Sequence, residues 1–474
     1  MSSPESTRLD ISYRRILRLT WPVLVSQLSF TAMGIIDTVM VGRLGVTALA
    51  AVGLGHFLSW WILSFFWGLL AGVNTLVAQA VGARRHEDAA VAFWQGVYLS
   101  LLAAGFVMAM VPAVPWLVGL TGASPEVREL TSAYMSVRLL GGASFVIYLV
   151  GDNFYRGLGE TRVPMWCGVA QALVNCGLNY LLIFGKLGFP ALGVVGAGWG
   201  TAIAQLLVGL GLHATILARR QTFADYGLLR NWRFEPKVFL RLTTLSLPIA
   251  VQVFMEMGGI TVFTAIVARI GDAEMAATNA VIQAWSVAFM AGFALSVGAT
   301  TLVGQSIGAG VPEEGRRAVR RILHIGLGLS AVLGLIYGLF PEALMALFVE
   351  ADQVDRLRPF ARPLFMVVVA SLFFDLLFNV LSGALRGAGD TKYPMVVNIG
   401  SAWLLFVPAA IVGSLFWGLE GAWWALFLHV VAMAVVLEWR FRGDGWIRPP
   451  VAGADGVGAS QEEGAATATS PGIA

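Results

Sequence analysis

The chain of 474 residues is 57% hydrophobic and only 12% charged, with a mean hydropathy of +0.76. Soluble domains carry about 25% charged residues, so this composition excludes an ordinary soluble protein and indicates a polytopic helical membrane protein. The net charge of +3 does not indicate nucleic-acid binding, because the basic residues gather in the connections between apolar segments. The two cysteines and five scattered histidines provide neither a disulfide framework nor the spacing of metal ligands.

Apolar segments long enough to cross a bilayer as helices follow one another along the chain. We expect twelve spans, which places both termini on the same side of the membrane. Most Lys and Arg residues fall in the connections on the side of the membrane that carries the termini, and few fall on the opposite side. The positive-inside rule therefore predicts that both termini are cytoplasmic. The predicted spans are 16–41, 49–74, 91–115, 132–153, 164–184, 192–217, 241–268, 276–303, 321–340, 361–384, 394–416 and 420–440.

A polar connector near the midpoint of the chain divides these spans into two sets of six. We expect an N-terminal six-helix lobe at 1–217, a cytoplasmic linker at 218–240 and a C-terminal six-helix lobe at 241–442. The remaining segment, 443–474, is small and polar and cannot bury a core, which predicts a disordered cytoplasmic tail.

The two predicted lobes contain an internal repeat. At a displacement of 226 residues Pro22 matches Pro248, and at a displacement of 230 the motif RGLGET, which begins at Arg156, recurs as RGAGDT from Arg386. An even number of spans per repeat gives both lobes the same orientation, related by a pseudo-twofold axis along the membrane normal. Further matching pairs are Arg43 and Arg269, Gly45 and Gly271, Gln79 and Gln305, Gly82 and Gly308, and Trp199 and Trp424.

Three acidic residues lie inside predicted spans without a basic partner at helical spacing: Asp37, Glu256 and Asp375. A charged side chain there costs on the order of 2.5–3.5 kcal/mol by insertion scales, so each must face protein, water or a cation. In the repeat, Phe263 stands at the position equivalent to Asp37, and Phe30 stands at the position equivalent to Glu256. Because the acids are not repeated, a packing role shared by the two halves is disfavoured. The two alternatives are an acid held by a hydrogen bond within the bundle and a proton or cation site on a transport path.

A fourth acid within a span, Asp152, has a local explanation. It lies four residues before Arg156, so the two side chains can pair across one helical turn without any transport function.

Two further pairs of residues have both a structural and a functional interpretation. Asn175 and Asn179 lie on one face of the fifth span, where they either bridge helices or, beside a buried Asp, supply oxygen ligands to a hard cation such as sodium. Pro22 and Pro248 lie about one turn into the first span of each lobe, where each forms either a fixed kink or a hinge.

The sequence resembles the multidrug and toxic compound extrusion (MATE) family, and within it the NorM-like branch, over about residues 12–442. The motifs that carry the resemblance are IIDTVMVGRLG in the first span, LVAQAVGA and LVGQSIGA after the second and eighth, and the two RGxG(E/D)T loops. The family implies two six-helix lobes around a central cavity that opens alternately to each side. It also implies export of amphipathic, often cationic organic compounds in exchange for sodium or protons, with no cofactor other than the coupling ion.

Two positions depart from the pattern of some relatives and leave the coupling ion and the exported compounds open. Ser371 stands where relatives can carry a tyrosine, and 277–279 reads Ala-Thr-Asn where some relatives have a His-Gln or Gln pair. The ion-coupling residues that the resemblance implies are Asp37, Asn175, Asn179 and Thr201 in the first lobe, and Glu256 and Asp375 in the second.

We therefore expect a secondary active transporter of a bacterial inner membrane and not an enzyme. It would act as a monomer whose partners are small organic compounds and the lipid bilayer. The alternatives are a lipid-linked glycan flippase of the same superfamily, which usually has basic residues in its cavity, and an integral-membrane enzyme, for which the sequence provides no nucleophile–base or metal constellation. A channel is disfavoured because the acids occur singly in two unlike halves and not in rings.

Overall fold

A computed structural model describes residues 9–219, 224–349 and 353–447, and the regular elements in these ranges are helices. The predicted tail at 443–474 lies almost wholly outside the described residues, as does part of the predicted linker. The helices that form the membrane-spanning body are α1 (Tyr13–Gly42), α2 (Val46–Leu70), α3 (Gly72–Gly82), α4 (His86–Ala109), α6 (Pro125–Leu158), α7 (Arg162–Phe184), α8 (Gly193–Ala218), α9 (Pro236–Ala268), α10 (Asp272–Gly308), α11 (Pro312–Leu339), α13 (Val354–Gly387), α14 (Lys392–Gly400), the π-helix η4 (Ser401–Phe406) and α15 (Val407–Arg442). Two short helices, α5 (Val114–Gly119) and α12 (Pro341–Ala346), follow α4 and α11.

Eleven continuous helical runs in the described residues are long and apolar enough to cross a membrane. The last run, Lys392–Arg442, has 51 residues and would be about 77 Å long if straight, more than twice the roughly 30 Å of a bilayer core. The run is not straight, because the backbone of Trp417 and Gly418 is non-helical. Gly413 and Gly421 then face each other so closely that a Cβ on Gly413 would lie 2.5 Å from the Gly421 carbonyl oxygen. The run therefore folds back into two arms, which correspond to the eleventh and twelfth predicted spans.

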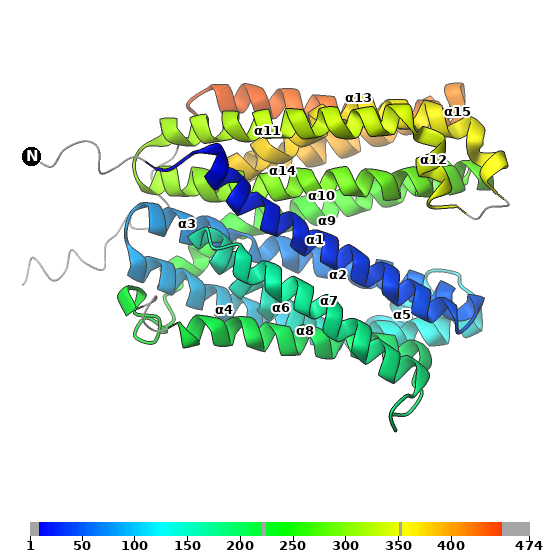
Figure 1. The fold of residues 1–474 in the computed structure, drawn as a ribbon, viewed down its shortest axis with the longest axis horizontal. Coiled ribbons are helices and arrows are strands. Elements are labelled where there is room, and N and C mark those ends of the chain that lie inside the picture. The colour runs from blue at the N-terminus through cyan, green and yellow to red at the C-terminus, as the bar shows by residue number, and fades with distance from the viewer. Residues whose placement is uncertain (1–8, 220–223, 350–352, 448–474) are drawn as a thin grey trace, which may run out of the picture.

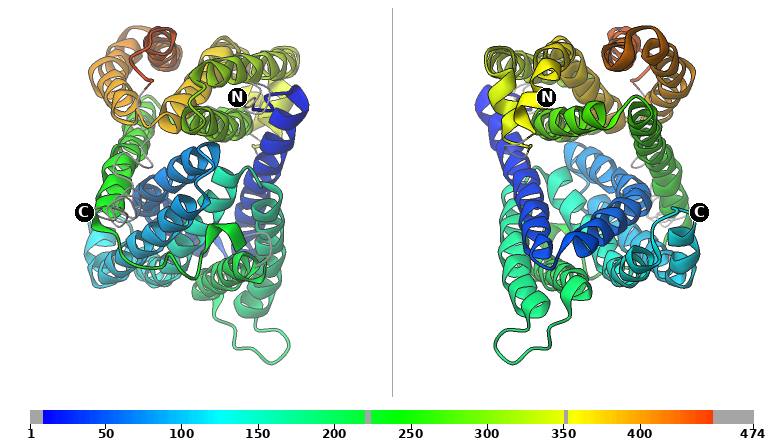
Figure 2. Two further views of the ribbon diagram at one scale, coloured as in Figure 1. Left: turned by 90° about the vertical axis from the view of Figure 1, so that its left-hand side faces the viewer. Right: turned by 90° about the vertical axis from the view of Figure 1, so that its right-hand side faces the viewer.

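The helices lie lengthwise in two groups, and the first helix of each half of the chain runs between them (Figure 1, Figure 2). Near its start, α1 contributes Ile16 and Leu19 to a buried cluster formed with α10, α11, α13 and α15. In the same way, α9 contributes Leu242 and Leu245 to the cluster formed by α2, α4, α6 and α8. Each half thus buries the beginning of its first helix in the core of the other half.

Pro22 and Pro248 occupy equivalent buried places in these two crossing helices. The backbones come close there: a Cβ on Gly68 of α2 would lie 2.7 Å from the Cα of Ala250, two residues after Pro248. Glycine at position 68 is therefore required for α2 and α9 to pack at this distance.

A symmetric set of hydrogen bonds joins the two halves at one end of the molecule, where helix α3 and the start of α1 lie (Figure 1). Gln79 Nε2 donates to the carbonyl oxygen of Gly387 at 2.9 Å, and Gln305 Nε2 donates to that of Gly157 at 3.2 Å. The carbonyl groups at the C-terminus of a helix lack intrahelical partners, and each half supplies a glutamine to those of the other half. The threonines one turn earlier, Thr75 and Thr301, donate to the carbonyl oxygens of Arg386 and Arg156, each at 3.0 Å.

We call these residues the inter-half seam: Thr75, Gln79, Gly157, Thr301, Gln305 and Gly387. Two glycines allow the backbones to meet there. A Cβ on Gly82 would lie 2.0 Å from the Gln305 carbonyl oxygen, and one on Gly308 would lie 1.9 Å from that of Gln79. The reciprocal contacts are those that a twofold relation between the halves produces. The glutamines and glycines come from the motifs LVAQAVGA, LVGQSIGA and RGxG(E/D)T, and Thr75 and Thr301 come directly before the first two.

Candidate ion-coupling sites

The first candidate site joins three helices of the first half. Asn179 Nδ2 of α7 donates to Asp37 Oδ1 of α1 at 2.5 Å and lies 3.3 Å from Asn175 Oδ1. Asn175 Nδ2 in turn donates to Thr201 Oγ1 of α8 at 3.0 Å. The structure therefore brings together all four residues that the resemblance implies for this half.

Close packing of α7 on α8 builds this site. A Cβ on Gly200 would lie 1.9 Å from Asn179 Oδ1, so glycine at position 200 is required for the amide to take its place. Asn179 Oδ1 is buried and has no hydrogen-bond partner among the described residues. An unmatched amide oxygen beside the Asp37 carboxylate is a suitable ligand for a hard cation or for a protonated group.

A buried arginine near Asp37 is a feature that sequence analysis missed. Arg138, in the middle of α6, is 6% exposed and interacts electrostatically with Asp37 and with His56 of α2. It lies within the predicted span 132–153, and that position is the signal that could have identified it. Its neighbours could not be found from the sequence, because they come from other helices.

The second candidate site lies in the other half, where Glu256 of α9 and Asp375 of α13 interact electrostatically. Asp375 is 7% exposed and Glu256 is half-buried. Asn379 Nδ2 lies 3.3 Å from Asp375 Oδ1 and donates to the Asp375 carbonyl oxygen at 2.9 Å. The amide of Asn398 on α14 acts on Glu256, and its Nδ2 lies 3.5 Å from Met433 Sδ. The predicted pair of acids is therefore present, together with two amide side chains that sequence analysis did not identify.

A second arginine, Arg386, also lies close to this site. Its Nη2 donates to Gln252 Oε1 at 3.1 Å, and its charge acts on Glu256. The equivalent residue in the first half, Arg156, forms the predicted local pair with Asp152, at 2.9 Å and almost fully buried. In the second half Ser382 occupies the place of Asp152, so Arg386 has no acid one turn away on its own helix and acts instead on α9.

The two positions that depart from some relatives have local partners. Ser371 Oγ donates to the Val367 carbonyl oxygen of its own helix at 2.7 Å. Thr278 Oγ1 accepts a hydrogen bond from Trp423 Nε1 at 3.2 Å within the core. Neither hydroxyl is bonded to Glu256 or Asp375 in the described part of the chain.

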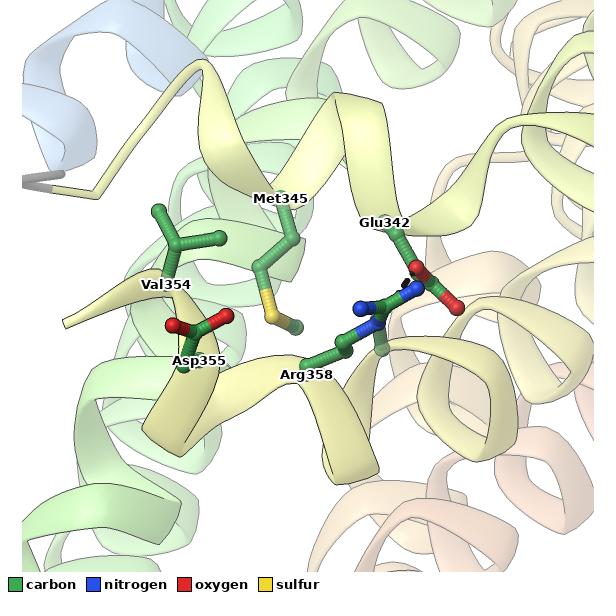
Figure 3. Close-up of a pocket in the computed structure, with 6 residues that line it drawn as sticks. Glu342, Met345, Val354, Asp355 and Arg358 are labelled. Atoms are coloured by element: carbon green, nitrogen blue, oxygen red, sulfur yellow. Dashed lines mark ion pairs between the residues drawn. The ribbon is translucent and has the colours of Figure 1, made fainter.

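A small hollow of about 270 Å³ beside α12 is separate from both candidate sites (Figure 3). Glu342 and Arg358 form an ion pair of 2.7 Å across it, and both side chains are largely exposed. An exposed pair of this kind contributes about 0–1 kcal/mol to stability. None of the predicted site residues lines this hollow.

Comparison with known proteins agrees with the fold and the motifs. The MatE family model matches residues 22–181 and 248–412, one segment in each half. The chain is 33% identical over 457 residues to a probable multidrug resistance protein NorM of Pseudomonas aeruginosa, covering 93% of this chain and 91% of the relative. A NorM of Rhizobium meliloti is 30% identical, covering 90% and 93%. A solved outward-facing multidrug resistance MATE family transporter superposes with a TM-score of 0.84 at 22% identity, covering 90% of this chain and 95% of that one.

The helical fold and the charged groups held within its spans define a multi-pass membrane transporter and not an enzyme. The chain belongs to the MATE family, and its relatives place it in the NorM-like branch. The resemblance and the all-helical fold class predicted from the sequence are thereby confirmed.

Proposed function

We propose that the protein exports amphipathic organic compounds, many of them cationic, in antiport with sodium or protons. The observation that carries the proposal is the pair of unlike acidic sites within the spans, Asp37 in one half and Glu256 with Asp375 in the other. Asp37 and Glu256 each lie beside an amide side chain from a different helix, and Asp375 lies beside Asn379 of its own helix. The multidrug resistance named for the relatives supports the same class of substrate.

The physical basis of coupling is competition for a carboxylate. An acid in apolar surroundings is costly to keep ionised, and it becomes neutral by taking a proton or a sodium ion. An organic cation competes for the same negative charge, so binding of one cation favours release of the other. Exchange further requires that the two ligands favour different conformations, since a ligand with equal affinity for both states shifts neither. If Glu256 and Asp375 converge on a single site, their titrations are coupled and neither acid has a pKa of its own.

Alternating access would proceed by opening the inter-half seam. The termini would be cytoplasmic, as the distribution of basic residues predicts, so the seam would close the cytoplasmic end of a path between lobes 1–217 and 241–442. Pro22 and Pro248 lie in the helices that pass between the two groups, which suits them to act as hinges. We propose that one chain is the transporting unit.

A transport assay in proteoliposomes tests this function and identifies the ion. A sodium gradient or a proton gradient alone should drive efflux of a cationic dye by the wild-type protein. Glu256→Gln and Asp375→Asn should each reduce efflux to background, and Asp37→Asn should impair it. Gradient-driven efflux at the wild-type rate in the Glu256→Gln, Asp375→Asn double variant contradicts the proposal.

The control acid should be exposed. Asp152 is unsuitable, because removing one partner of the buried Asp152–Arg156 pair costs about 3–5 kcal/mol. Glu129 is exposed on α6, and Glu129→Gln should leave efflux unchanged.

Topology has a separate test in intact cells. A cysteine introduced at 236 in the predicted linker should resist a membrane-impermeant thiol reagent, whereas one at 355, near the start of α13, should react. The reverse pattern would place the termini outside.

A further inference from the structure

Arg138 has donors that nothing in the described residues satisfies. Its Nε and Nη1 are buried without a hydrogen-bond partner among the described residues. A buried charged donor left unsatisfied carries a large desolvation cost, above the roughly 1–3 kcal/mol of a neutral group. A buried guanidinium without hydrogen-bond partners needs a negative charge nearby to offset this cost. The acid on which Arg138 acts electrostatically is Asp37.

The first half contains both the acid and the arginine, and the second half contains neither. At the displacement of 226 residues Asp37 becomes Phe263, and at the displacement of 230 Arg138 becomes Val368. Phe263 and Val368 are both buried members of one apolar cluster in the second half. The second half thus shows how this place is packed when neither charge is present.

The charges also differ between the two candidate sites. In the first, the positive charge of Arg138 acts on the one carboxylate, Asp37, so the two charges together sum to zero. In the second, two carboxylates, Glu256 and Asp375, act on each other, and Arg386 acts on Glu256 alone, which leaves a net negative charge. A cation that arrives at Asp37 therefore competes with a positive charge that is already part of the protein.

We propose that Arg138 is the resident counter-cation of Asp37 and sets the affinity of the first-half site for arriving cations. Its charge weakens the binding of an organic cation, so that the bound cation is released and does not remain in the site. This role rests on the proposed function of Asp37 as a cation-binding group. Arg138 is thus a specificity-determining residue that acts through Asp37.

Equilibrium binding of tetraphenylphosphonium to the purified full-length protein tests the proposal. Arg138→Gln should bind this cation more tightly, on the order of tenfold, because it removes a unit positive charge whose field acts on Asp37. Arg138→Lys keeps the charge and should bind as the wild type does. Arg128→Gln removes an exposed charge from the same helix and should change nothing.

A double-mutant cycle separates a role through Asp37 from a role in packing. Asp37→Asn should weaken binding, and Arg138→Gln should have no further effect when Asp37 is already Asn. Unchanged or weaker binding by Arg138→Gln, with a loss in Asp37→Asn, overturns the role of Arg138 and leaves the proposed function standing. Equal binding by the wild type and Asp37→Asn overturns the cation site itself. If Arg138→Gln does not fold, Arg138→Met supplies the same charge removal in a side chain suited to apolar surroundings, and the same outcomes apply.

Discussion

The two halves of the chain share a scaffold but place their polar groups at different positions within it. The residues that correspond to Asn175, Asn179 and Thr201 in the second half are Leu405, Ala409 and Leu426. Conversely, Asp375 and Asn379 correspond to Phe145 and Leu149 in the first half. Each site is therefore replaced by apolar packing in the other half.

This complementary arrangement separates what the repeat needs for folding from what it needs for transport. The inter-half seam is symmetric because both halves must close on each other, and its residues are duplicated. The acids are not duplicated, so the two halves differ in the charges that they hold within the spans. A symmetric pair of sites would respond identically to both ligands.

The largest expected loss of stability comes from introducing an acid in the second half at the position equivalent to Asp37. Phe263→Asp places a carboxylate in an apolar cluster with Phe406 and Trp423, and burying an unpaired charge there should cost about 3–5 kcal/mol. Thermal unfolding in detergent should show a large loss of stability. Adding Val368→Arg should recover part of it, and no recovery would mean that the pairing of Asp37 with Arg138 depends on further groups.

The next effect tests the close packing that builds the first site. Gly200→Ala adds a Cβ 1.9 Å from Asn179 Oδ1, so the amide must leave Asp37. We expect at least a tenfold loss of efflux with a stability loss of about 1–3 kcal/mol, since overpacking has this cost. Gly105→Ala is the matched control, because its Cβ would meet nothing within 4 Å.

A smaller effect should follow from giving Arg386 the partner that Arg156 has. Ser382→Asp places an acid one turn before Arg386, which should draw the guanidinium away from Glu256 and Gln252. With less positive charge near Glu256, cations should bind the second-half site several-fold more tightly. Tetraphenylphosphonium binding in the Asp37→Asn background measures this site alone, and unchanged affinity would show that Arg386 does not act on it.

The smallest effects should be found in the seam, where they should also be equal. Gln79→Ala and Gln305→Ala each remove one hydrogen bond to a carbonyl oxygen, with a net contribution of about 0.5–1.5 kcal/mol. Both should favour the open cytoplasmic end to the same degree, measured as the rate of thiol labelling of a cysteine placed at 81. Clearly unequal rates would mean that the halves do not close symmetrically.

Local patterns in the sequence determined the class of protein, the order of its spans and the positions of its unpaired acids. Hydropathy over twenty residues decides whether a helix can cross a membrane, and spacing within one helix decides whether Asp152 can meet Arg156. The asymmetry between Asp37 and Phe263 is likewise visible by aligning the repeats. Spacing within the fifth span also identified Asn175 and Asn179, and the family resemblance added Thr201 to the first site.

Tertiary structure alone decided which helices bring charges together. Arg138 and Arg386 act on acids of α1 and α9, which are distant in sequence, and no spacing within one helix encodes that. The exchange of the starts of α1 and α9 between the two cores and the fold-back at Trp417 and Gly418 also depend on packing between helices. A local pattern specifies which face of a helix is polar, whereas the partner of that face is set by the packing of the whole chain.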